Sequence, residues 1–574
     1  MKKTILYIIL CLAAIPSAFA EEDAKKKDWG YVTGSLESNN HVYVEDVANN
    51  FYPSRLPQLK DGNIFASNDY LKLDYHRNRL SAGMQLEGAF PSVVGYPIPE
   101  TLLSLSNLFV SWRDDSYSVT AGTFYEQLGS GLLFRSWEDR MLGLNNAMLG
   151  ARATYNFEDK IMMRAFWGVP RLGKVSDNNV MMGYDRKFFG FGFTPSVNVA
   201  AADLSLSLSN LFNMTTASLS VEGSVINKHE PLVEELAAVG CRMNNLGWSG
   251  RVNFELSGFF AKGEYVDAGK QITSVADAYF GDKAKNGNAQ LLEFGYNRRG
   301  LGVTVTGRRL ESMNQKIIAY EGSHHGYQSA ANMVSYIPAM CTQYTYMLTT
   351  LNPYACETGD DALRSGEIGG QIDAFYNFRR GTTLGGKRGM KMHANFSTYY
   401  ALDSYGKVDG KDCLFQDFSF DVEKQWTKKF KSVLLYSLQN YCDVNKHNYV
   451  NGNQVGMAHV VVADLLYKWT PTLSTRMELQ YLSAKEDNGD WMAGLLEFNL
   501  APHWSVFASD MWNHGNSDFS QRKHYYNAGL SYTMEHLRVS AGYGRYKAGF
   551  ICSGGVCREI PAYTGANFTL TASF

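Results

Sequence analysis

Beyond its first twenty residues, the sequence lacks any long apolar run, which excludes membrane-spanning helices there because each needs about 20 consecutive apolar residues. Charge is scarce as well: 19% of residues are charged, and a net charge of −2 offers no basic surface for nucleic acid. Only 14 residues are proline, whereas 53 are glycine, 35 tyrosine and 32 phenylalanine. Helical periodicity is almost absent and strand-length stretches recur, which favours an all-β protein.

The amino-terminal segment has the features of a secretory signal peptide. Two lysines precede a short apolar stretch, and the triplet 18–20 (Ala-Phe-Ala) supplies a small-x-small cleavage motif. We therefore predict a signal peptide over residues 1–20 and a single exported domain over residues 21–574.

The final segment alternates between an apolar and a polar face. Phe568, Leu570 and Ala572 alternate with polar residues, and the last residue is Phe574. This pattern resembles the carboxy-terminal recognition strand of bacterial outer-membrane proteins. We expect Phe568, Leu570 and Phe574 to form an insertion signal, with outer-membrane lipid and the barrel-insertion machinery as partners.

Alternation of this kind recurs along the chain. Val252 and Phe254, for example, share a face opposite Arg251 and Glu255. Because no water in a bilayer can satisfy backbone amides, strands cross it only as a closed barrel, apolar toward lipid and polar toward the lumen. The sequence therefore predicts one transmembrane antiparallel β-barrel of about 24 strands (range 18–26) in the cell outer membrane.

Connection lengths give the barrel an orientation. Going backwards from the carboxy terminus, long connections such as 549–562 and 310–366 alternate with short ones such as 534–536 and 500–501. Short connections are assigned to the periplasm and long ones to the outside. The segment 203–211 does not fit this alternation, and it is predicted to be an irregular connection rather than a strand.

The stretch 121–150 combines five glycines with a dense group of charges. Glycine permits bends and close backbone approach, so this stretch is predicted to cross the lumen as a constriction. A lumen enclosed by two dozen strands is too wide for strand side chains to fill, and the extracellular loop 310–366 is the second candidate for narrowing it. The charges either contact a solute or pair to hold the loop in place. They are Glu126, Arg135, Glu138, Asp139 and Arg140.

The part of this stretch from Ala121 to Arg140, continuing to Gly150, resembles one found in an uncharacterised, domain-of-unknown-function family of outer-membrane barrels from Bacteroidota-type bacteria. The resemblance extends loosely across the barrel. It implies the fold and the location, and it implies no particular activity.

Further charges are predicted to face the lumen from the strands. A water-filled lumen would suit them, and so would any wet polar interior without solute specificity. These charges are Lys72, Asp74, Glu87, Arg251, Glu255, Arg308, Lys391, His393, Glu497 and Arg538.

Seven cysteines follow the signal peptide, and six are predicted to lie on the outer side, with Cys241 near an inner turn. An oxidising envelope permits disulfides. Spacing cannot fix the connectivity, so free or differently paired thiols remain an alternative. The candidate pairs are Cys341–Cys356, Cys552–Cys557 and Cys413–Cys442.

Catalytic and metal sites have little support. Ser323, His324 and His325 are adjacent in one loop, where successive side chains of an extended chain point to opposite sides. We predict no enzyme activity, no metal and no cofactor.

Two functions remain. The first is a passive porin-like or transport channel for unknown solutes. The alternative is a non-transporting scaffold or accessory subunit of a secretion or surface-protein assembly complex, with an envelope protein as partner. The oligomeric state is left open.

Overall fold

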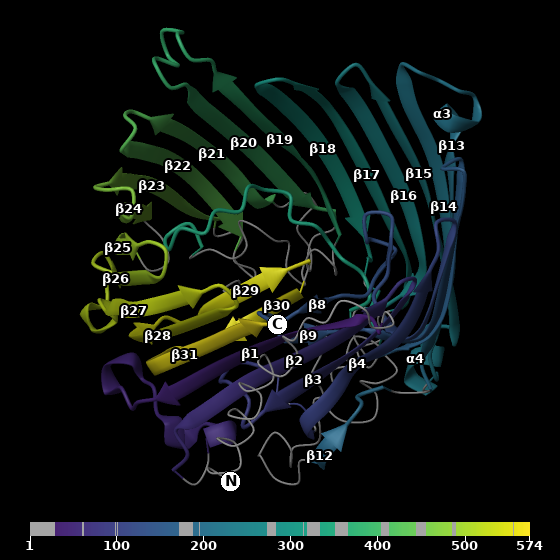
Figure 1. The fold of residues 1–574 in the computed structure, drawn as a ribbon, viewed down its shortest axis with the longest axis horizontal. Coiled ribbons are helices and arrows are strands. Elements are labelled where there is room, and N and C mark those ends of the chain that lie inside the picture. The colour runs from purple at the N-terminus through teal and green to yellow at the C-terminus, as the bar shows by residue number, and fades with distance from the viewer. Residues whose placement is uncertain are drawn as a thin grey trace.

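The protein is a large closed barrel in the computed structural model, with its strands tilted around a wide interior (Figure 1). The predicted signal peptide lies outside the described residues. The structure describes residues 29–59, 62–97, 99, 101–171, 187–193, 196–232, 234–272, 283–313, 315–317, 333–350, 366–402, 413–442, 455–484, 489–554 and 556–574.

One 25-stranded sheet forms the wall, and setting aside the short parallel strand β12 (Lys187–Gly190) leaves 24 antiparallel strands. The first twelve are β1 (Tyr31–Tyr43), β2 (Phe65–Arg77), β3 (Leu80–Ala89), β4 (Thr101–Arg113), β5 (Tyr117–Phe124), β10 (Met148–Phe157), β11 (Ile161–Pro170), β13 (Asn198–Ser207), β14 (Ala217–His229), β15 (Asn244–Leu256), β16 (Phe259–Gln271) and β17 (Lys285–Arg298). The second twelve are β18 (Leu301–Glu311), β19 (Glu367–Phe378), β20 (Met390–Ala401), β21 (Cys413–Gln425), β22 (Phe430–Cys442), β23 (Val455–Lys468), β24 (Leu473–Ala484), β25 (Trp491–Leu500), β26 (Trp504–Trp512), β27 (His524–Met534), β28 (Leu537–Tyr546) and β31 (Tyr563–Ser573).

The barrel closes where β31 pairs with both β28 and β1. Backbone bonds extend this seam to the last residue, because Gly34 and Phe574 exchange N–H···O bonds of 2.7 and 3.0 Å. A Cβ at Gly34 would collide with the Phe574 ring, so glycine makes room for the terminal side chain. The predicted fold and strand number are confirmed.

The wall strands have one apolar and one polar face, as β15 illustrates. Leu246, Trp248 and Val252 are 67%, 46% and 47% exposed on the outside, whereas Ser249 and Arg251 between them are buried. The closed ladder satisfies backbone groups internally, and the apolar exterior suits lipid. The protein is therefore an outer-membrane β-barrel.

The two ends of the barrel differ in their connections. Residues 257–258, 299–300 and 535–536 are tight turns at one end, and the longer connections lie at the other. The alternation of connection lengths is confirmed, and it places the tight turns in the periplasm. Cys241 lies between β14 and β15 on the long-loop side, so its assignment to an inner turn was wrong.

The segment 203–211 was wrongly excluded from the wall. Its first part belongs to β13, which pairs along its length with β11 and β14. The remainder is the short helix α3 (Leu208–Leu211), which makes the inner connection to β14. Asp203 faces the lumen, where Arg164 and Arg251 neutralise it, and this pairing lets a carboxylate sit in mid-strand.

The remaining described elements are short. No helix among the described residues is long and apolar enough to cross a membrane. They are η2 (Val47–Asn49), η3 (Pro53–Arg55), η4 (Pro57–Leu59), α4 (Glu234–Ala238), η8 (Phe519–Gln521), β6 (Gln127–Leu128), β7 (Phe134–Arg135), β8 (Glu138–Asp139), β9 (Leu144–Asn145), β29 (Gly549–Ser553) and β30 (Val556–Ile560).

Candidate functional site

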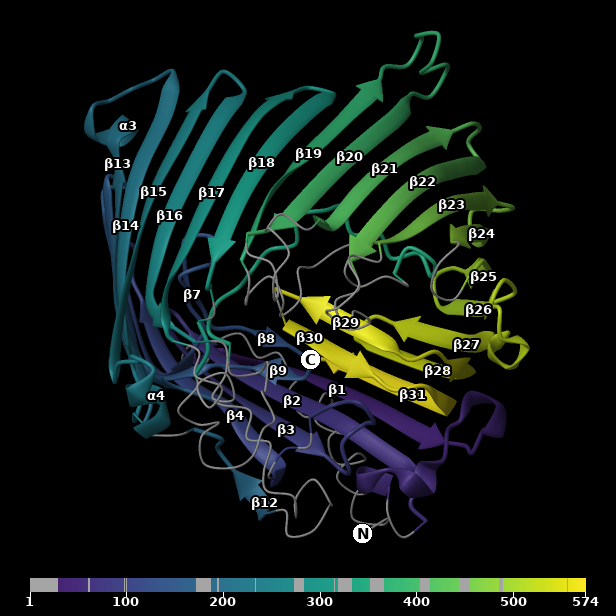
Figure 2. The same cartoon turned by 180° about the vertical axis from the view of Figure 1, so that it is seen from behind.

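The segment between β5 and β10 leaves the wall and folds inside the barrel as two miniature hairpins, β6–β7 and β8–β9 (Figures 1 and 2). Leu128, Leu132 and Phe134 have no exposed surface. They pack with inward-facing wall residues such as Val199 and Val266. An apolar core therefore lies within the lumen.

Gly129 brings this segment against the charged wall. Its φ of +57° lies in the left-handed region that glycine adopts without strain. A Cβ at this position would collide with the side chains of Arg251 and Glu264. Next to it, the Ser130 amide donates a hydrogen bond of 3.2 Å to Glu264 Oε2. The segment thus docks directly onto β15 and β16.

A network of ion pairs continues from this contact. Glu126 pairs with Arg164 at 2.6 Å and with Arg152 at 3.3 Å. Arg164 also reaches Asp203 at 3.0 Å, and Asp203 pairs with Arg251 at 2.7 Å. Four wall strands are thereby tied to one carboxylate of the inner segment.

The other predicted charges of this segment also contact protein groups. Arg140 pairs with Glu138 at 3.1 Å and with Glu37 of β1 at 2.7 Å. Arg135 lies over an aromatic ring of a neighbouring loop, 4.0 Å from its centroid, and Asp139 accepts two backbone hydrogen bonds. All five charges lie inside the barrel, and each is engaged by the protein.

Residues 333–350, part of the long loop between β18 and β19, run along the inner wall. The Tyr344 hydroxyl donates to Asp421 of β21 at 2.7 Å. The Leu348 amide donates to Gln480 of β24 at 3.0 Å, and the Leu348 side chain is fully buried against the wall. We call residues 333–350 the luminal strap.

Backbone hydrogen bonds join three distant segments inside the lumen. Tyr336 N donates to Gly131 O, and Ile337 N donates to Gly554 O in the β29–β30 hairpin, both at 2.9 Å. These bonds link loops from three parts of the chain into one internal body. We call it the luminal plug, which consists of residues 125–147, the luminal strap and residues 549–560.

Several predicted wall charges form buried or partly buried pairs. Arg308 Nη2 lies 2.6 Å from Glu367 Oε1, and the two side chains are 1% and 0% exposed. Glu87 pairs with Arg171 at 2.7 Å. Arg251 belongs to the network around Glu126. These groups are held by counter-ions and make no open charged lining.

Other predicted wall charges are less enclosed. His393 hydrogen-bonds to Asp373 at 2.7 Å and to Asp421 at 2.8 Å, and Lys72 pairs with Asp74 at 3.1 Å. Glu497 accepts a hydrogen bond from Asn499. Within the described part of the chain, the predicted lumen charges that are exposed and make no ion pair are Glu255, Lys391 and Arg538.

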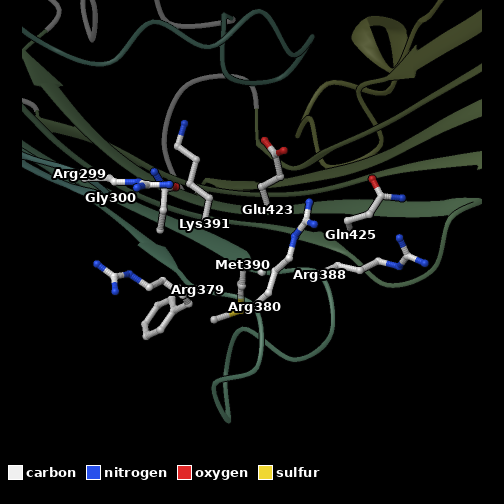
Figure 3. Close-up of a pocket in the computed structure, with 12 residues that line it drawn as sticks. Arg299, Gly300, Arg379, Arg380, Arg388, Met390, Lys391, Glu423 and Gln425 are labelled. Atoms are coloured by element: carbon white, nitrogen blue, oxygen red, sulfur yellow. The ribbon is translucent and has the colours of Figure 1, made fainter.

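A cavity of about 610 Å³ lies at the periplasmic rim, beside the turns that end β17 and β19 (Figure 3). Five cationic side chains line it, and the one lining carboxylate, Glu423, pairs with Lys431 at 2.8 Å. We call the five cations the basic rim. They are Arg299, Arg379, Arg380, Arg388 and Lys391.

The sequence prediction named only Lys391 from the basic rim. A signal for the others existed, because paired cations flank the glycine-rich turn at 379–380 and 387–388. It also missed Arg164 and Glu264, which alternate with apolar residues as lumen-facing groups should. Ser323, His324 and His325 lie outside the described residues.

The cysteine predictions have mixed outcomes. Cys552 and Cys557 are directly opposite each other in the β29–β30 hairpin, a placement compatible with their predicted disulfide. Cys413 has a free thiol, so its pairing with Cys442 is wrong for this structure.

Cys341 is buried in the luminal strap. Its predicted partner, Cys356, lies outside the described residues.

Solved structures are similar to this chain at low sequence identity. The siderophore receptor PirA from Pseudomonas aeruginosa is similar with a TM-score of 0.40 and 10% identity, covering 96% of this chain and 82% of that one. The copper transporter OprC gives 0.37 and 8%, with coverage of 96% and 82%. A mutant porin from Rh. blastica gives 0.25 and 10%, with coverage of 58% and 93%. No curated protein matches the chain.

A family model covers the chain from end to end, over residues 1–574. The chain belongs to that family, which is described as a family of unknown function (DUF6029).

Proposed function

We propose that this protein is a closed barrel that serves as a non-transporting envelope component, a scaffold or accessory subunit of a secretion or surface-protein assembly complex. The observation that carries the proposal is the luminal plug. Its leucines at 128, 132 and 133 have no exposed surface. A passive channel needs a continuous water path, whereas close-packed apolar side chains exclude water.

The plug is also held by charge. Removing one partner of a buried ion pair leaves an uncompensated charge and costs about 3–5 kcal/mol. Withdrawal of residues 125–147 would separate the buried Glu126 carboxylate from Arg152 and Arg164. It would also break the more exposed Arg140–Glu37 pair, whose contribution is smaller. Spontaneous opening is therefore strongly disfavoured, and this supports a closed resting state.

The test is conductance in planar lipid bilayers. We expect no current steps from the intact purified protein. Replacing residues 127–146 with a short glycine–serine linker should produce steady conductance, because this segment carries most of the apolar core. Water-filled pore conductance from the intact protein would contradict the proposal.

A second candidate is the passive porin-like or transport channel for unknown solutes. Two cavities at the periplasmic end favour it: one of about 610 Å³ at the basic rim and another of about 540 Å³ beside β2–β5. Transport through them requires movement of the luminal plug. Uptake of a radiolabelled solute into liposomes containing the intact protein would favour this candidate.

The resemblance of residues 121–150 further leads us to propose an origin in Bacteroidota-type bacteria. That origin would be tested by finding the same stretch in genomes of this group. We propose no enzymatic activity and no cofactor.

A further inference from the structure

We propose that the basic rim binds an acidic segment of a periplasmic protein, through carboxylates spaced along its chain. The identification of the ligand as a protein rests on the proposed scaffold function. The site itself rests on the geometry of the rim.

The cavity faces the lumen and not the lipid. Lys391 is opposite both Asn377 and Glu423 in the strand register, so the three side chains share a face. His393, two residues further along, is on that face too, and it contacts Tyr344 of the luminal strap. Side chains two apart on a strand point the same way. Lipid head groups at the outer surface of the barrel therefore have no access to this site.

Among the described residues, none of the five cations of the basic rim makes an ion pair, and the nearby carboxylate of Glu423 is already engaged by Lys431. In the second cavity at this end, three of the four lysine and arginine side chains are paired: Lys72 with Asp74, Arg79 with Asp114 and Arg152 with Glu126. Cations that stabilise the barrel are paired, so the unpaired set is available to a ligand.

The turn that carries three of these arginines is already ordered. Residues 379–389 form the longest of the turn-only connections at the periplasmic end. Backbone bonds within it join Gly381 N to Gly386 O at 2.7 Å and Gly389 N to Gly385 O at 2.8 Å. Lys424 Nζ from β21 donates to the carbonyls of Leu384 and Gly385. A preorganised site loses less entropy on binding.

The spread of charge indicates the kind of ligand. The cations come from two adjacent turns and the start of β20, around a cavity of about 610 Å³. A single small anion would contact only part of this set. Arginine binds carboxylates in a bidentate manner, so several carboxylates on one extended segment match both the number and the spacing of the donors.

The experiment uses the full-length protein in lipid nanodiscs and a fluorescein-labelled 12-residue peptide of alternating glutamate and glycine. Binding is measured by fluorescence anisotropy at 150 mM salt. The test variant is Arg379→Gln/Arg380→Gln/Arg388→Gln. The matched control is Lys428→Gln/Lys429→Gln/Lys468→Gln, which removes the same charge from exposed positions at two neighbouring periplasmic turns.

We expect the peptide to bind the intact protein, the rim variant to raise its Kd at least tenfold, and the control variant to change it less than threefold. Equal weakening by both variants would overturn the proposal, because it would show an unspecific field effect. Absence of binding to the intact protein at 150 mM salt would overturn it too. So would displacement of the peptide by millimolar inorganic phosphate or free glutamate, which would identify a small-anion site.

Conductance separates this proposal from the proposed function. Current from the intact protein would refute the closed scaffold while leaving peptide binding at the rim measurable. Conversely, if the intact protein gives no current and also binds no peptide, only the basic rim as a docking site is refuted.

Discussion

Arg299 and Arg308 lie at opposite ends of β18, one just before its periplasmic start and the other near its outer end. Arg308 is buried, paired with Glu367, and lies over the ring of Tyr399. Arg299 is exposed at the rim of an open cavity and has no ion pair among the described residues. The outer half of the lumen uses charge to hold loops in place, whereas the basic rim at the periplasmic end carries cations without a paired carboxylate among the described residues.

This difference shows where the molecule can tolerate change. In the plugged part, Arg308 is matched to Glu367 and Glu126 to Arg152 and Arg164, and the leucines of the plug are packed. At the basic rim, the cations make no ion pair among the described residues. Stability should therefore depend on the plugged part, and recognition of soluble partners on the basic rim.

The largest expected effect comes from breaking the Arg308–Glu367 pair. Arg308→Met should lower the free energy of unfolding by about 3–5 kcal/mol, because it leaves a buried carboxylate without its partner. Urea unfolding in detergent micelles measures this loss. Arg299→Met is the control and should leave the midpoint unchanged. Comparable losses from both variants would abolish the distinction between the two halves.

The second-largest effect is expected from a substitution that removes packing inside the plug. Leu132→Ala removes a side chain with no exposed surface from the plug and should cost roughly 2–5 kcal/mol of local stability. Hydrogen exchange of the amides in residues 127–146 reports this opening. The control Leu384→Ala, at a rim position that is 52% exposed, should leave exchange unaltered. Unchanged protection in the plug variant would show that the segment is not packed as described.

Two glycine-to-alanine substitutions distinguish the cost of backbone strain at positive φ from the cost of a steric clash with the added Cβ. Gly129 and Gly381 both have positive φ, at +57° and +85°, so alanine at either costs about 1–2 kcal/mol. Only at Gly129 would the added Cβ also collide with Arg251 and Glu264. Gly129→Ala should therefore lower the thermal midpoint more than Gly381→Ala. Equal shifts would mean that the plug does not dock closely at Gly129.

The smallest effect concerns pH. Burial acts to raise the pKa of Asp46, but hydrogen bonds from Arg545 and Thr564 outweigh it and lower the pKa. The pKa of Asp46 is lower in the folded protein than in the unfolded chain, so its ionised carboxylate stabilises the fold. This contribution to stability is complete at pH values above the unfolded pKa and is lost as the pH falls through the folded pKa.

The contacts of Asp46 with Arg545 and Thr564 hold the connection between β1 and β2, and their loss can be measured as pepsin cleavage of that connection. Cleavage should rise as pH falls below about 4. Relative to an unfolded control protein digested at the same acidic pH, Asp46→Asn should be cleaved readily throughout and lose that dependence. A wild-type profile that matches the variant would contradict the anchoring role.

The strands could be predicted because each carries its own signal. The alternation of Val252 and Phe254 with Arg251 and Glu255 is readable without knowing any partner. Residues 121–150 and the loop 310–366 could be predicted as candidates for the plug, because a lumen this wide must be filled, but their contacts could not. The contacts of the plug join residues far apart, such as Ile337 and Gly554, and such pairs leave no local pattern.

The one misplaced strand has the same explanation. Asp203 looks unsuited to a membrane wall until Arg164 and Arg251 are placed beside it, and these come from positions 39 and 48 residues away. The basic rim was missed for a different reason. Cations in a periplasmic turn are common surface residues, and only the cavity between the turns gives them a shared environment.

The order of the plug segments along the chain has a consequence for biogenesis. Its last component, the β29–β30 hairpin, precedes the final strand β31, which also closes the wall against β1. The seal can therefore be completed only when nearly the whole polypeptide has reached the membrane. A chain that stalls before this point would leave the outer membrane permeable, so completion of threading and restoration of the barrier coincide.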